Sequence, residues 1–380
     1  MIWLVIGLAV LVGAAEYYSL TKLPGFLSAE SRLLSRTAEP GTPFVLQTTL
    51  RNLSRVPASM IAVTERIPPQ AIPQDPGPEQ EAGGTRLSWR TWLMPRQKLV
   101  KEIPFVIDSR GCYVFRGNSL FVGDFMGLRG SVRLFDRHEE MVIFPSLQEI
   151  PGLEDTLGGY LGEISVRRFI LEDPILTAGL GEYTGREPMR AINWKQTARS
   201  RQTMVNQYDH TSDPSAVVIL NLAYTVRYAV DRDLLERTLS CARGVIEALE
   251  QRRIRYSLCT NMLTAGSIGE WLYVPEGLGA AHKSAILEGL GRSTLDTAES
   301  LTDLLDRVLR HMDKNSCCIL ITPDAAQEDI PIAGRMAGGS ISPAGGSKED
   351  ILSLTKRLED RSGCPVLVLG VQKGGVSGWS

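Results

Sequence analysis

The sequence predicts an α/β plus all-β protein, in which a short N-terminal membrane helix precedes a β-sandwich and a doubly wound parallel sheet. Residues 2–15 are apolar without interruption, and short strand-like segments separated by turns follow them. In the second half of the chain, apolar runs alternate with amphipathic helical segments, which is typical of a parallel sheet covered by helices. The expected domains are an anchor over residues 1–24, a sandwich over 28–148, a linker and signature region over 149–212, and an α/β domain over 213–380.

The apolar N-terminal run is short for a membrane span, which takes about 20 apolar residues. The prediction of an anchor therefore depends on Tyr17 and Tyr18 lying at the membrane interface. The first cationic residue, Lys22, follows the run, which favours a cytoplasmic location for the rest of the chain. We thus expect a single-pass protein of the cell membrane. A cleaved signal peptide ending near Gly13-Ala14-Ala15 is the alternative, and it would make the chain a secreted domain.

Period-two patterns predict the strands of the sandwich. Leu87–Leu93 alternates Leu and Trp with Ser, Arg and Thr, as a half-buried strand does. Residues 68–84 are rich in Pro, Gly and Gln and predict an exposed loop. No helix longer than one turn is expected in this region. Further strands are expected over residues 44–50, 60–67, 99–107, 113–122 and 142–145.

Continuous apolar runs predict the buried strands of the α/β domain. These runs cover residues 216–222, 256–260, 317–322 and 365–371. Apolar residues at helical spacing predict helices over 231–253, 280–290, 300–311 and 347–360, the last of them capped by Ser347 with Asp350. Before this domain, the Gly-rich stretch 151–162 predicts a linker, and residues 203–208 predict a strand.

Composition narrows the function classes. Hydrophobic residues make up 43% of the chain and charged residues 22%, which is ordinary for a globular protein. A formal net charge of -2 argues against general nucleic-acid binding, because no basic excess is present to neutralise phosphates. The six cysteines form no CxxC pair, and most lie in apolar runs, so we expect reduced core thiols in a cytosolic compartment.

The stretch Arg186–Arg199 is the most unusual segment of the chain, because it gathers basic residues around Trp194. A short helix beginning near Pro188 would place Arg190 and Trp194 on one face and Lys195 with Arg199 in a basic row. One interpretation is an amphipathic element whose Trp fills a domain junction. The other is a surface that binds a partner or an anionic group. The residues predicted to bind a partner are Arg190, Asn193, Trp194, Lys195 and Arg199.

The spacing of Arg190, Ile192-Asn193-Trp194-Lys195 and Ala198-Arg199 resembles the signature of the bacterial family called domain of unknown function 58. Arg110-Gly111-Cys112-Tyr113 and the loop from Asp124 also resemble that family, although we expect only a turn there, with Arg110 pairing with Asp124. The resemblance implies a von Willebrand factor A-like α/β domain and a MoxR-type AAA ATPase as one partner.

The resemblance also indicates where a divalent metal would bind, beyond the first strand of the α/β domain. The matching residues, Asn221 and Ala223, lack the expected carboxylate and hydroxyl, which leaves Thr225 and, from a later loop, Thr322 and Asp324. A hard cation prefers several oxygen ligands with carboxylates among them. We therefore expect no metal, no cofactor, no small-molecule substrate and no catalytic residue.

These observations predict a membrane-anchored, non-enzymatic adaptor that recruits protein partners, with a MoxR-type AAA ATPase among them, in the assembly or maturation of other proteins. The alternative, from another class, is a metal-dependent hydrolase that uses Asp124, Glu182 or Asp324 in the crevice of the α/β domain.

Overall fold

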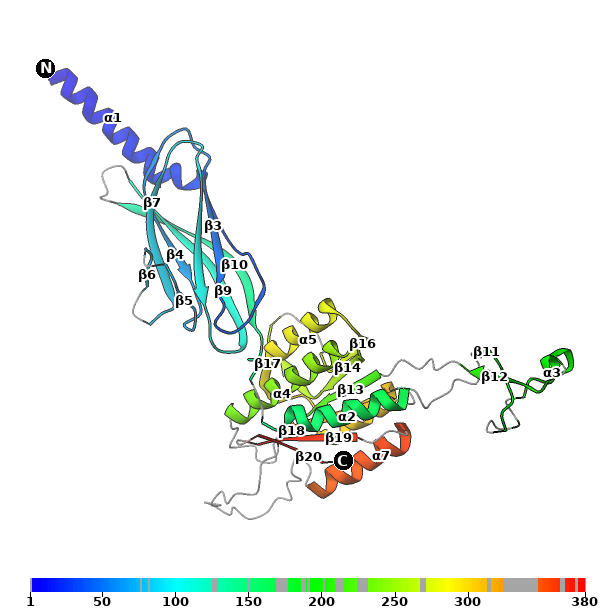
Figure 1. The fold of residues 1–380 in the computed structure, drawn as a ribbon. Helices are drawn as coiled ribbons and strands as arrows, with labels where there is room; N and C mark the ends of the chain where they lie inside the picture. The colour runs from blue at the N-terminus through cyan, green and yellow to red at the C-terminus, as the bar shows by residue number, and fades with distance from the viewer. Residues whose placement is uncertain are drawn as a thin grey trace, which may run out of the picture. The chain divides into compact units, whose positions relative to one another are not determined.

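The fold comes from a computed structural model of the 380-residue chain. The chain divides into two compact units: Met1–Ser146 with Thr264–Ile268 and Leu287–Ser293 form the first, and the remaining residues form the second. Figure 1 shows the elements of both units. The structure describes residues 2–75, 77–80, 83–124, 129–148, 151–168, 177–185, 189, 192–200, 202–208, 215–223, 232–266, 271–312, 316–323, 348–362, 366–372 and 375–379.

The first unit contains two sheets that share one apolar core, which is the sandwich that the period-two patterns predict. One sheet has the order β1-β3-β8-β5, and the other has the order β2-β10-β9-β4-β7-β6. The strands are β1 (Leu27–Leu33), β2 (Thr37–Ala38), β3 (Phe44–Asn52), β4 (Ala58–Arg66), β5 (Ile72–Pro73), β6 (Glu79–Gln80), β7 (Arg86–Leu93), β8 (Lys98–Val106), β9 (Gly111–Gly123) and β10 (Gly130–Ile143).

Alternation of inward and outward side chains explains why these segments are strands. In β3 every second residue from Phe44 to Asn52 is buried, and the residues between them are not. Phe44, Phe105 and Phe115 meet in the core with ring centroids 5.8 to 6.1 Å apart, in one stacked and two edge-on pairs. Aromatic pairs at this spacing add to the stabilisation from area burial. The predicted loop 68–84 contains the two short strands β5 and β6.

The predicted membrane anchor is wrong. Helix α1 covers Ile2–Thr21, and η1, a short 3-10 helix, follows it over Leu23–Phe26. Across the described residues, no helix combines the length and the apolar character that a membrane crossing requires. The uninterrupted apolar run ends at Ala15, before Glu16, so at about 1.5 Å per residue it covers about 21 Å. The hydrocarbon core of a bilayer is about 30 Å thick.

The second unit is built on a six-stranded sheet with the order β16-β14-β13-β18-β19-β20. These strands are β13 (Ser215–Leu220), β14 (Arg255–Thr260), β16 (Tyr273–Gly277), β18 (Cys317–Pro323), β19 (Val366–Gln372) and β20 (Gly375–Trp379), while β15 (Met262–Thr264) pairs with β17 (Ser293–Thr297). The prediction of a doubly wound, all-parallel sheet of von Willebrand factor A type is wrong, because the sheet is mixed. Its four central strands run parallel, but β16 and β20 pair antiparallel at the two edges. The two residues between β19 and β20 are too few for a crossover, so the chain must reverse.

Helices pack on this sheet. They are α4 (Arg232–Gln251), α5 (Ala280–Arg292), α6 (Leu301–His311) and α7 (Lys348–Ser362). Leu304 and Leu305 of α6 and Leu358 of α7 share a buried cluster with residues of β13, β18 and β19. Ser300 caps α6 in a capping box with Asp303, which fixes the start of that helix. Ser347 lies outside the described residues.

The Gly-rich stretch predicted as a linker is instead part of helix α2, Leu153–Arg168. Leu153, Leu157 and Tyr160 are buried, and their i, i+4, i+7 spacing forms one apolar stripe. The Tyr160 hydroxyl donates to the carbonyl oxygen of Cys318 at 3.1 Å. The glycines at 158, 159 and 162 led to the prediction of a linker, because glycine disfavours helix interiors.

Candidate functional site

The signature region folds into a small hairpin with a helix between its strands. Strands β11 (Thr177–Glu182) and β12 (Met204–Tyr208) pair antiparallel, and helix α3 (Trp194–Ser200) lies between them in the chain. The backbone of Ile192 bridges Val205, so the chain is still extended just before the helix. Helix α3 therefore begins at Trp194 and not near Pro188, which lies outside the described residues.

Asn193 explains this start. Its side-chain Oδ1 accepts from the backbone N–H of Gln196 at 3.1 Å, which is the bond of an N-cap residue. Its Nδ2 donates to Oδ1 of Asn206 on β12 at 2.8 Å, and its backbone N–H donates to the Met204 carbonyl oxygen at 2.8 Å. Asn193 thus holds α3 to the hairpin, and the partner-binding role predicted for it stays a prediction.

One face of α3 is hydrogen-bonded to β12, and the other is exposed to solvent. On the bonded face, Thr197 Oγ1 accepts from the backbone N–H of Met204 at 2.9 Å. Lys195 and Arg199 are exposed one turn apart on the other face, and Trp194, which lies beside Thr197 at i, i+3, is 66% exposed. Met189, just before the helix, is 70% exposed. We call Met189, Trp194, Lys195 and Arg199 the signature surface. Arg190 lies outside the described residues.

Asn221 lies at the position where the resemblance would place a metal, and its amide takes part in three hydrogen bonds. Its Oδ1 accepts from Asn261 Nδ2 at 2.7 Å and from the backbone N–H of Ala223 at 3.0 Å. Its Nδ2 donates to Thr322 Oγ1 at 3.0 Å. Asn221 and Asn261 are 1% and 0% exposed. The amide nitrogen therefore occupies a direction from which a carboxylate would offer an oxygen. Thr225 and Asp324 lie outside the described residues.

This arrangement predicts that Mg²⁺ and Ca²⁺ do not bind tightly to the protein. Calorimetric titration of each cation into the protein should show no saturable heat in the micromolar range, because a neutral amide network offers a hard cation no carboxylate. The Asn221→Asp variant serves as the comparison, since it restores a carboxylate at this position. Saturable micromolar binding by the parent protein would contradict the prediction and favour the hydrolase.

Asp124 and Arg110 each have structural partners. Asp124 is 4% exposed, and its Oδ2 accepts from the backbone N–H of Arg129 at 3.0 Å. Arg110 Nη1 donates to the carbonyl oxygens of Leu290 and Gly291 at 3.2 and 3.3 Å, and to that of Ser293 at 2.8 Å. The last carbonyls of a helix have no partner within the helix. Arg110 therefore caps the C-terminal end of α5, a role that the sequence did not indicate.

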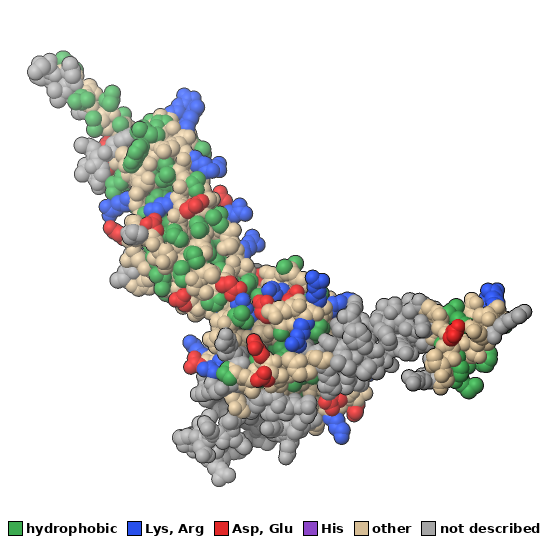
Figure 2. Space-filling view, viewed as in Figure 1, with side chains coloured by type: hydrophobic (Ala, Val, Ile, Leu, Met, Phe, Trp, Pro, Cys, Tyr) green, Lys and Arg blue, Asp and Glu red, His purple; other side chains and the backbone are tan. Residues whose placement is uncertain are grey.

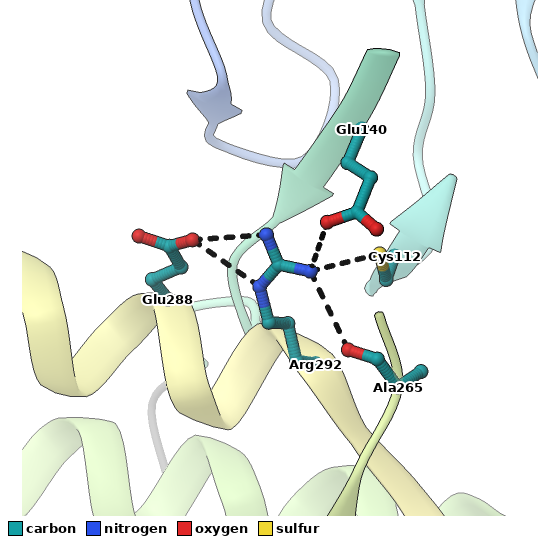
Figure 3. Close-up of polar contacts among 5 residues, drawn as sticks. All are labelled: Cys112, Glu140, Ala265, Glu288 and Arg292. Carbon is teal, nitrogen blue, oxygen red and sulfur yellow. Dashed lines mark hydrogen bonds and ion pairs between the residues drawn. The ribbon is translucent and has the colours of Figure 1, made fainter. Parts of the chain in front are cut away.

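Besides the signature surface, the structure has a buried cationic site, which is centred on Arg292 in the first unit (Figure 3). Its side chain is 7% exposed, and its Nη1 lies 2.6 Å from Glu140 Oε2. Its Nε and Nη2 both donate to Glu288 Oε1, at 3.2 and 3.0 Å. Nη1 also contacts Cys112 Sγ at 3.3 Å. Burial raises the pKa of the Cys112 thiol, and the Arg292 charge opposes that rise.

Gly266 leaves room for this guanidinium. Its backbone has φ +89°, and a Cβ built on it would lie 2.3 Å from Arg292 Nη1. The sequence could not have indicated the cluster, because Glu140 and Arg292 are 152 residues apart. Within the described ranges, no three His, Cys, Asp or Glu side chains are grouped so that they could hold a metal ion.

The structure shows where the cysteines and the charged side chains lie. Cys241, Cys259, Cys317 and Cys318 are buried free thiols, Cys112 is a partly buried one, and Cys364 lies outside the described residues. Figure 2 shows acidic and basic side chains interspersed with apolar ones on the visible face of the sandwich. This face therefore carries no large patch of one sign.

No protein-family model and no curated protein matches this sequence. Solved structures match about a third of the chain at low similarity. One is the CARDB domain of a protein from Pyrococcus furiosus, with 14% identity, 31% of this chain, 91% of that chain and a TM-score of 0.21. Another is a cohesin module of a Clostridium perfringens family 33 glycoside hydrolase, with 10% identity, 31% and 96% coverage and a TM-score of 0.24. A type II cohesin domain from the cellulosome of Acetivibrio cellulolyticus has 12% identity, 30% and 94% coverage and a TM-score of 0.24. Scores this low support no inference about what this chain does.

Proposed function

We propose that this protein is a non-enzymatic adaptor that binds a protein partner through its signature surface. The observation that carries the proposal is the division of α3 into two faces. Asn193 and Thr197 fasten the helix to β12, while Lys195 and Arg199 are exposed on the side away from Thr197, and Trp194, beside Thr197, is also exposed. A rigidly held helix loses little conformational freedom when it binds, which favours affinity.

The residue types of the signature surface also favour protein recognition. Trp and Arg are enriched among the residues that dominate binding energy, especially where an apolar anchor lies beside charged groups. Trp194 has a large apolar ring with one N–H donor, and Lys195 and Arg199 add two cations one turn apart. The complementary partner surface has an apolar pocket bordered by carboxylates.

A MoxR-type AAA ATPase is the first partner to test. The resemblance of residues 190–199 to the domain of unknown function 58 family motivates this choice. In this proposal the protein recruits the ATPase during the assembly or maturation of other proteins. A catalytic role has less support, because Asn221 is a neutral amide within a closed network.

The proposal predicts that charge reversal on α3 weakens partner binding. The purified full chain would be titrated against a purified MoxR-type ATPase from the same organism, in parallel with affinity capture and mass spectrometry. The Lys195→Glu/Arg199→Glu variant should bind at least tenfold more weakly, because the two introduced carboxylates would repel the carboxylates that border the partner's pocket. Trp194→Ala should lose about 2 kcal/mol, or about 30-fold in affinity.

The control is Lys356→Glu/Arg357→Glu on α7, which makes the same charge change at two exposed positions. This variant should bind as the parent does. If both double variants weaken binding equally, net charge and not the signature surface is responsible. If neither Lys195→Glu/Arg199→Glu nor Trp194→Ala changes the set of captured proteins, the signature surface is not the binding site.

A further inference from the structure

Glu65 is a carboxyl group enclosed in the core of the sandwich. It lies on β4 and is 1% exposed. Ser31 Oγ donates to its carboxylate, with Oε1 at 2.9 Å and Oε2 at 3.0 Å, and Thr48 Oγ1 donates to Oε1 at 2.7 Å. Asn118 Nδ2 donates to Ser31 Oγ at 2.6 Å. We call these four side chains the Glu65 network.

The Glu65 network crosses from one sheet of the sandwich to the other. Ser31 on β1 and Thr48 on β3 belong to the four-stranded sheet, whereas Glu65 on β4 and Asn118 on β9 belong to the six-stranded sheet. Strand β1 is at the edge of its sheet and pairs only with β3 among the described strands. Within the network, Ser31 therefore joins this edge strand to the opposite sheet, and Arg133 and Arg137 of β10 also bond to β1, at the Leu27 carbonyl oxygen and at Glu30.

No described cation bonds to Glu65. Arg66, Arg137 and Glu139 line a small cavity beside it. The guanidinium of Arg137 is engaged by the Glu139 carboxylate at 3.0 Å and by that of Glu30.

On the side of β8, Lys101 is the residue that pairs with Thr48, and its Nζ lies over the Trp89 ring, 4.8 Å from the ring centroid. The donors to Glu65 are thus neutral side chains: the hydroxyls of Ser31 and Thr48, with the amide of Asn118.

The surroundings leave a negative charge on Glu65 poorly solvated. The cavity beside it has a volume of about 10 Å³, which is at the lower limit for one water molecule. Asn118 Oδ1 is also buried and has no hydrogen-bond partner within the described part of the chain. A buried carboxylate without a cation or water carries a large desolvation cost. Burial accordingly raises the pKa of Glu65 to about 7, although the hydrogen bonds from Thr48, Ser31 and Asn118 oppose the rise.

We propose that protonation of Glu65 controls whether edge strand β1 stays packed on the opposite sheet, and we call this device the lock. With its proton, the carboxyl group stays inside the closed network. When the proton leaves, the carboxylate must be hydrated, and β1 separates from its backbone partner β3 and from β4 and β9 around Ser31 so that water enters. Strand β1 is the element that moves, because an edge strand has backbone partners on one side only.

The lock has a defined pH response. In the open form, water reaches Glu65, and its pKa returns to the ordinary 4.5, whereas in the closed form it is about 7. The open form therefore loses its proton first. The ratio of open to closed form rises about tenfold per pH unit between these two values and becomes constant above pH 7.

Hydrogen exchange of the full chain, followed by mass spectrometry of peptides that cover β1, tests the proposal between pH 5 and pH 8. Rates are corrected for the intrinsic pH dependence of amide exchange. In the parent protein the opening constant of β1 should rise about tenfold per unit to pH 7 and then level off. In Glu65→Gln it should not change with pH. Glu79→Gln, an exposed acid on β6, is the control and should behave as the parent.

Two results would overturn the proposal: a parent opening constant that does not change with pH, or the same pH dependence in Glu65→Gln. A second variant keeps the test decisive if Glu65→Gln fails to fold. Thr48→Val removes a donor to the carboxylate, so it should raise the pKa of Glu65 and move the plateau to a higher pH. A plateau at the same pH in Thr48→Val would also count against the lock.

Discussion

Replacement of Arg292 by Met is expected to lower the free energy of unfolding of the first unit by about 3 kcal/mol. The Arg292 side chain is 7% exposed, and its guanidinium contacts Glu140 and Glu288. Met preserves most of the apolar stem but removes the charge, so both carboxylates lose their partly buried cation. We place the effect at the lower end of the range for buried ion pairs because the two glutamates are 23% and 32% exposed and stay partly hydrated.

Urea denaturation monitored by hydrogen exchange of the sandwich amides would measure the loss of stability in this unit. Arg292→Lys should recover part of it, because an ammonium keeps the charge but cannot bond Glu140 and Glu288 through separate nitrogens in a planar fork. Arg32→Met, at an exposed position on β1, is the matched control and should leave stability unchanged. An Arg292→Met protein as stable as the parent would mean that the cluster in Figure 3 contributes no net stability.

The stability of the sandwich is expected to fall by about 3 kcal/mol as pH rises from 4.5 to 7. The pKa of Glu65 is about 7 in the folded protein and 4.5 as its ordinary value. The folded state therefore holds the proton more tightly, so its contribution to stability is fully present below pH 4.5. This contribution decreases while only the unfolded chain loses the proton, and it is gone once pH exceeds about 7.

Urea denaturation of the sandwich across this pH range would measure the change. Glu65→Gln should show a flatter profile and should be more stable than the parent at pH 8, because its side chain carries no charge to desolvate. A parent profile that Glu65→Gln reproduces would assign the pH dependence to other groups. This measurement concerns global unfolding and the exchange of β1 concerns local opening, although both depend on the raised pKa of Glu65.

Much of the local structure could be predicted from the sequence. The period-two strands of the sandwich and the continuous apolar strands at 215–220 and 317–323 appear where expected. Helix α4 was predicted within two residues at each end. These elements are predictable because the burial of one face imposes a periodicity that the sequence must carry. Helix α2 also carried this signal at Leu153, Leu157 and Tyr160, but the neighbouring glycines led to the prediction of a linker.

The candidate sites were predicted less well. Trp194, Lys195 and Arg199 were singled out from the basic stretch 186–199 and its resemblance to a family signature, and their role as a binding surface stays a prediction. Asn193 was placed in the same group, although only the contact with Asn206 on the neighbouring strand reveals that it fastens the helix. Glu65 was missed. Its place in the alternation Ile61, Val63, Glu65 would have put it on the inward face.

The sequence by itself determined most of the strands and helices, the start of α6 after its N-cap Ser300, and which side of each strand is buried. These properties depend on residues within a few positions of one another. Tertiary structure alone decided that β16 and β20 run antiparallel at the sheet edges, that Arg292 meets Glu140, and that Glu65 meets Ser31 and Thr48. Periodicity specifies which face of a strand is buried, but it does not specify which distant side chains lie opposite that face. The charges and pKa values of the buried groups depend on those distant partners, so they could not be predicted from local sequence.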